Sequence, residues 1–140
     1  MAKGAAADSV FIKTKRLDIN NVRMTSRLEN ARKLYKQHNL LANDLTGRDR
    51  VVQLANAQKY ISQKEEIKLF QAENNLAKWR IKGAENDQLN NHVASAEKAY
   101  LKQREIAFQA EMAYLEHMWH LRETTSVCLL YTSPSPRDRG

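Results

Sequence analysis

The chain has 140 residues, of which 42% are hydrophobic and 28% charged, and a formal net charge of +7. It has one cysteine, which excludes an intrachain disulfide, and no run of about 18 apolar residues that a transmembrane helix would need. Charged residues interrupt the N-terminus before the apolar part of a signal peptide could form, so we expect a cytoplasmic chain.

Residues 1–12 are expected to form a flexible N-terminus, and a helix is predicted over residues 13–45. Within it, one face follows alternating spacings of three and four, as in a coiled-coil seam. This seam comprises Leu17, Asn21, Met24, Leu28, Ala31, Tyr35, His38, Ala42 and Leu45. The helix is expected to end near Leu45 and the next to begin near Gly47, where Thr46 and Asp49 have the three-residue spacing of a capping box.

A second helix is predicted over residues 47–82, with apolar side chains on two neighbouring faces. One face carries Ile67, Phe70, Asn74, Ala77 and Ile81, and the other carries Leu69, Ala72, Leu76 and Trp79. An apolar arc this wide usually contacts two neighbours, which favours a bundle. Gly83 and the polar residues 84–91 predict a second turn, although a lone glycine costs a continuous helix only about 1 kcal/mol.

A third helix is predicted over residues 87–124, and its regular spacing is the longest in the chain. Its seam comprises Leu89, Val93, Ala96, Tyr100, Gln103, Ala107, Ala110, Tyr114, His117 and Leu121. The fold class is therefore all-α, an elongated helical bundle with an up-down-up course. The alternative is a coiled-coil hairpin in which the second and third helices fuse and the chain dimerises.

Three amide residues interrupt the apolar seams, namely Asn21, Asn74 and Gln103. Polar residues at such positions can fix the register of two helices or their choice of partner, at some cost in stability. The competing interpretation is that they face solvent at the edge of the stripe.

The C-terminal segment resembles a translated sequencing adapter. The eleven residues from Cys128 to Asp138 match one reading frame of the mosaic-end adapter used in transposase-based DNA libraries. We therefore interpret residues 128–140 as an adapter-derived, disordered and non-native tail, and expect the native C-terminal sequence to be missing beyond about Val127. Both prolines and the cysteine lie in this tail, so residues 1–127 have little to interrupt long helices.

Residues capable of catalysis or metal binding are sparse. His117 and His120 could share one helical face, but a di-iron bundle needs Glu-x-x-His motifs on two helices, and no glutamate here precedes a histidine by three residues. The sequence also lacks a Gly-x-Ser-x-Gly motif, a phosphate-binding loop and a dinucleotide-binding glycine fingerprint. We predict no catalytic residues, no metal site and no cofactor.

The excess positive charge lies in the first third of the chain, where residues 1–50 contain eleven basic and five acidic side chains. Seven basic residues there form a candidate face for an anionic partner: Lys13, Arg16, Arg23, Arg27, Arg32, Lys33 and Lys36. The first four share one face of the predicted helix and could contact a phosphate backbone. No aromatic residue lies between Lys13 and Leu34 to stack on bases. The other interpretations are that this basic face contacts an acidic protein or solvent, or, less favoured, an anionic membrane surface.

Aromatic and large apolar residues gather on the third predicted helix. They form a candidate packing interface of Tyr100, Phe108, Met112, Tyr114, Leu115 and Trp119. Such a set at helical spacing favours packing in a core or between subunits. We therefore predict a non-enzymatic assembly, scaffold or adaptor protein, a homo-oligomer or a subunit of a larger assembly. The alternative is a nucleic-acid-associated protein that uses its basic first helix.

Overall fold

The computed structural model describes residues 2–132, and it describes side-chain surroundings between residues 9 and 123. The described residues form three long α-helices and one short 3-10 helix, with no strand. These elements are α1 (Ala2–Asn43), α2 (Gly47–Gly83), η1 (Asp87–Leu89) and α3 (Asn90–Thr132). The predicted all-α fold is confirmed.

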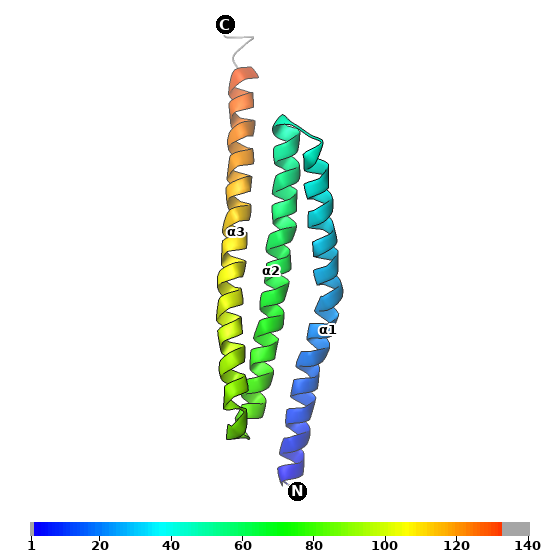
Figure 1. Ribbon diagram of the computed structural model, residues 1–140, viewed down its shortest axis with the longest axis vertical. Helices are drawn as coiled ribbons and strands as arrows, with labels where there is room; N and C mark the ends of the chain where they lie inside the picture. Colours follow the sequence, from blue (N-terminus) through cyan, green and yellow to red (C-terminus); the bar gives the residue numbers. More distant parts are fainter. Residues whose placement is uncertain (1, 133–140) are drawn as a thin grey trace.

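The three long helices run up, down and up, and α2 lies between the other two (Figure 1). Helix α2 packs against both α1 and α3, whereas α1 and α3 do not contact each other within the described residues. The bundle is therefore open, a single layer of helices rather than a closed triangle. The wide apolar arc of α2 serves both neighbours, as its width predicted.

The seam predicted for α1 lies against α2, since all of its positions are buried or half-buried. It extends further toward the N-terminus than predicted. Thr14 is buried, and its hydroxyl donates to the carbonyl of Val10 at 2.9 Å. The expected boundary at residue 13 is wrong, because α1 begins at Ala2 and includes residues 2–12 in the helix.

The buried core is made mostly of small side chains. Its apolar members are Leu28, Ala31, Ala42, Ala55, Ala57, Leu76, Ala96 and Ala107. Alanine allows helices to approach closely but removes little apolar surface from water, at about 25 cal/mol per Å². The apolar contribution per helical turn is therefore modest.

The turn between α1 and α2 depends on Gly47. Thr46 is the N-cap residue and is extended, but its side chain makes no capping hydrogen bond, so the capping box predicted with Asp49 does not form. Gly47 has a φ of +61°, in the left-handed region that L side chains rarely adopt. Across the turn, the guanidinium of Arg50 donates to the carbonyl of Ala42 at 3.0 Å and so caps the end of α1.

The second turn separates α2 from α3 at the place where Gly83 and the polar stretch predicted it. Helix α2 ends at Gly83, and the side chain of Asn86 accepts a hydrogen bond from the backbone of Gln88 at 3.0 Å to begin η1. A Cβ on Gly83 would lie 2.9 Å from a methyl group of Val93, so glycine allows α3 to approach closely here. The alternative with a fused second and third helix is thereby excluded.

Helix α3 extends beyond the predicted end of the third helix at residue 124. Helix α3 continues to Thr132, so residues 128–132 of the interpreted tail are helical rather than disordered in backbone. The remainder of that tail, residues 133–140, lies outside the described residues.

A substitution at Gly47 tests the role of its backbone conformation. Nothing lies within 4 Å of an added Cβ, so Gly47→Ala changes only the preference of the backbone. We expect Gly47→Ala to lower the free energy of unfolding by about 1–2 kcal/mol, and Gly47→Asn by less, because asparagine tolerates the left-handed region. Urea unfolding would measure both. An alanine variant as stable as the parent would show that the turn does not need this conformation.

Candidate functional site: protein interaction surfaces

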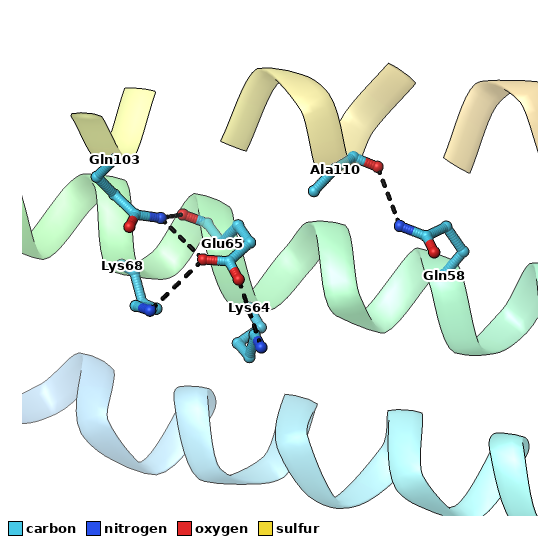
Figure 2. A network of polar contacts seen from close by, with 6 residues as sticks. All are labelled: Gln58, Lys64, Glu65, Lys68, Gln103 and Ala110. Atoms are coloured by element: carbon cyan, nitrogen blue, oxygen red, sulfur yellow. Dashed lines mark hydrogen bonds and ion pairs between the residues drawn. The ribbon is translucent and has the colours of Figure 1, made fainter. Parts of the chain in front are cut away.

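A buried polar contact joins α2 to α3. The side-chain amide of Gln103 donates to the backbone carbonyl of Glu65 at 3.0 Å and to its carboxylate at 2.9 Å (Figure 2). Both side chains are buried, with exposed fractions of 9% and 7% for the two residues. Two turns further along α3, seven residues after Gln103, the backbone carbonyl of Ala110 accepts a hydrogen bond from the side chain of Gln58 on α2 at 3.3 Å. These contacts fix the axial position of α3 against α2.

Two lysines neutralise the buried carboxylate. The ammonium of Lys64 lies 3.4 Å from one oxygen of Glu65, and that of Lys68 lies 3.6 Å from the other (Figure 2). Burial raises the pKa of Glu65, but the Gln103 hydrogen bond and the two positive charges outweigh it. The pKa of Glu65 therefore lies below its ordinary value of 4.5.

Lys64 extends this network to α1. Its ammonium lies 5.2 Å from the centre of the Tyr35 ring on α1, a cation–π arrangement. A chain of contacts thus runs from α1 through α2 to α3. The sequence did not identify Glu65 as buried, because its only local signal was a glutamate flanked by lysines, which is also typical of an exposed helix.

An amide cluster joins α1 to α2. The side chain of Asn21 donates to the carbonyl of Gln71 at 3.2 Å, and Gln71 donates back to the carbonyl of Asn21 at 3.0 Å. Asn74 donates to the Asn21 side-chain oxygen at 3.0 Å. Together with Gln103, these residues show that all three amide seam positions lie between helices. The interpretation that they face solvent is wrong.

The histidines lie in different settings. On the α1 seam, His38 hydrogen-bonds Gln53 at 2.6 Å and stacks on Tyr60, with ring centres 5.6 Å apart. His117 and His120 line a shallow hollow on α3. In the part of the chain that the structure describes, no three histidine, cysteine, aspartate or glutamate side chains gather as a metal site would require.

The basic face predicted on α1 is largely exposed. Lys13, Arg16, Arg23, Arg27, Lys33 and Lys36 are all exposed, whereas Arg32 is half-buried. Arg32 also pairs with Glu29 at 2.7 Å.

Apolar side chains lie among these charges, which the sequence analysis missed. Arg16 and Arg23 line a shallow groove together with Phe11, Ile12 and Ile19. The spacing of seven between Ile12 and Ile19 could have revealed the patch, had residues 1–12 been expected to be helical.

The interface predicted on α3 divides into two faces. Tyr100 and Tyr114 are half-buried on the side toward α2, where Tyr100 lines a groove with Leu76 and other residues of both helices. The other members are exposed on the opposite side. We call this second set the outer stripe of α3 and extend it by Leu101, which also lines the edge of that groove. The outer stripe comprises Leu101, Phe108, Met112, Leu115 and Trp119, with exposed fractions of 46%, 55%, 42%, 49% and 64%.

The chain is thus an all-α protein in which α2 runs antiparallel to both α1 and α3, with an apolar stripe on the outer helix α3 (Figure 1). No described helix is long and apolar enough to cross a membrane. Comparison with models of known protein families, with characterised proteins and with solved structures found no match.

The lowered pKa of Glu65 predicts a specific dependence of stability on pH. Because this pKa is lower in the folded chain than in the unfolded one, the contribution of Glu65 is complete above about pH 4.5 and is lost as the pH falls through the folded value. We expect Glu65→Gln to reduce the loss of unfolding free energy between pH 7 and pH 3, measured by urea unfolding.

Glu66 provides the matched control for this experiment, since it is the next residue in the chain and is exposed. Glu66→Gln should leave the acid dependence close to that of the parent. Equal effects of the two substitutions would contradict a special role for the buried carboxylate.

Proposed function

We propose that this chain is a non-enzymatic assembly protein that uses the outer stripe of α3 to pack against another helical surface. The observation that carries this proposal is the stripe itself: five large apolar side chains at spacings of seven, four, three and four, all exposed. This is the spacing of a coiled-coil seam in which the charged Glu105 occupies the position between Leu101 and Phe108. A helix that already has one seam against α2 gains no intrachain packing from a second one.

Exposed apolar residues occurring singly need no explanation, but a contiguous apolar patch is typical of an interaction site. The stripe runs from Leu101 to Trp119, which spans about 27 Å at 1.5 Å per residue. Phenylalanine, methionine and tryptophan are also the residue types enriched in protein interfaces. Length, spacing and composition all support a helix as the partner.

Removing apolar side chains from the stripe tests the proposal. We expect the parent chain to sediment above its monomer mass of 16.2 kDa at micromolar concentration and to dissociate on dilution. Phe108→Ser combined with Trp119→Ser should leave a folded monomer, because each substitution removes apolar area from the proposed interface. Sedimentation velocity over a concentration series would measure this, with circular dichroism to confirm folding.

Phe11→Ser is the matched control, because Phe11 is a phenylalanine of similar exposure, 61%, on α1. It should leave the assembly unchanged. A parent chain that stays monomeric at every concentration, or one that loses assembly only with Phe11→Ser, would contradict the proposed role of α3.

A second candidate function, binding to nucleic acid, is supported by the exposure of the α1 charges. We expect such binding to disappear in the variant Arg16→Ala, Arg23→Ala, Arg27→Ala. In the parent, the logarithm of affinity should fall with the logarithm of salt concentration, with a slope of about −0.9 per phosphate contacted on duplex DNA. Fluorescence anisotropy with a labelled duplex would measure both. Undetectable affinity at low salt would exclude this function.

A further inference from the structure

The charges that border the outer stripe of α3 identify what it packs against. On one border lie Lys102, Gln109 and Glu116, spaced by seven residues and therefore aligned two turns apart along the helix. On the other border lie Arg104 and Glu111, with the same spacing. All five are exposed. In each border the basic residue comes first along the chain and the acidic residue follows.

Such an order of charges can be complementary to itself when two copies of the helix pair in antiparallel orientation. In an antiparallel helix pair, equivalent borders of the two helices face each other, and the charges there set partner choice and orientation. With a twofold axis at Gln109, Lys102 of each copy lies opposite Glu116 of the other. On the second border, the same axis brings Glu111 of one copy nearest Glu111 of the other and does not pair it with Arg104, so the first border alone is complementary.

The centre of the first border nearly coincides with that of the apolar stripe. The midpoint of Lys102 and Glu116 is residue 109. The apolar stripe is centred between Phe108 and Met112, with Leu101 and Trp119 at its two ends. The apolar contacts and the pairs of Lys102 with Glu116 can therefore form together about one axis.

A parallel pair would be less favourable. In that arrangement the border that contains Arg104 on one helix faces the border that contains Lys102 on the other. Each residue of the first then faces the residue five positions later in the sequence on the other helix. Glu111 of each copy would then face Glu116 of the other, which makes two like-charge contacts where the antiparallel pair has one, and Arg104 would face the neutral Gln109. Only Glu97, which precedes Arg104 by seven residues on the same border, would find an opposite charge, on Lys102.

From this complementarity we infer that the outer stripe of α3 binds the same stripe of a second copy of this chain, in antiparallel orientation about a twofold axis near Gln109. The inference rests on the proposed function, and it names the partner and the orientation. Because α3 is an outer helix of the layer, the dimer joins two three-helix layers edge to edge (Figure 1). The two α2 helices stay on the far sides of the α3 pair.

Two charge reversals test the orientation. Lys102→Glu places two glutamates opposite each other at both ends of the antiparallel pair, and Glu116→Lys does the same with two lysines. Each single variant should dimerise at least about tenfold more weakly than the parent, measured by sedimentation equilibrium at low salt. An equimolar mixture of the two variants should form a heterodimer with affinity near that of the parent, because both ends are then complementary.

A parallel pair predicts the opposite sign for one variant. There Glu116→Lys would replace the contact between Glu111 and Glu116 by an attractive one, so this variant would dimerise more tightly than the parent. That result would overturn the antiparallel orientation while leaving assembly through α3 intact. Glu123→Lys, an exposed reversal of the same type beyond the stripe, serves as the control and should change the affinity little.

Other outcomes separate the inference from the proposed function. If the parent dimerises and Phe108→Ser with Trp119→Ser abolishes the dimer, but neither reversal alters its affinity, the stripe packs without the charge pairing described here and the inference is wrong. If the parent is monomeric, both the inference and self-assembly through α3 fail.

Discussion

Every contact between long helices in the described part of the chain involves α2. The positions of α1 and α3 relative to each other are therefore set only through the middle helix. Neighbouring residues on α2 serve different sides: Lys64 reaches Tyr35 on α1, while Glu65 binds Gln103 on α3. This is possible because successive side chains on a helix point about 100° apart. The chain of contacts through Lys64 and Glu65 is thus what couples the two outer helices.

The open layer leaves apolar side chains exposed on its outer helices, which a closed bundle would bury. In a closed three-helix bundle each helix buries its apolar stripe against both others, whereas here α1 and α3 each pack against one neighbour. Apolar side chains beyond that single seam stay exposed, as with Phe108 and Trp119 on α3 and Ile19 on α1. The outward distribution of apolar area therefore follows from the way the layer is built, and it leaves the outer helices available for other helices.

The sequence predicted the fold class, both turns and the seams, because the regular spacing of residues such as Leu28 and Ala107 depends only on the geometry of a single helix. It could not predict whether the bundle closes, since that depends on pairings between helices. For this reason Tyr100 and Phe108 were grouped into one interface, although one lies toward α2 and the other faces outward. Burial of Glu65 was missed for the same reason, because the donor that satisfies it lies 38 residues away.

The polar residues in the seams compensate for a weakness of the alanine-rich core. The side chain of alanine is short and interdigitates little with a neighbouring helix. Helices packed through Ala31, Ala55 and Ala107 would therefore lose little apolar contact if one helix slid along the other by two turns. A slide of α3 would, however, separate the carboxylate of Glu65 from the amide of Gln103, while Lys64 and Lys68 stay beside it on α2. A hydrogen bond to a charged group contributes about 1.5–3 kcal/mol. The amide cluster at Asn21 imposes the same condition on α1. Apolar burial therefore holds the helices together, while the hydrogen bonds select one register among several that apolar packing alone would allow.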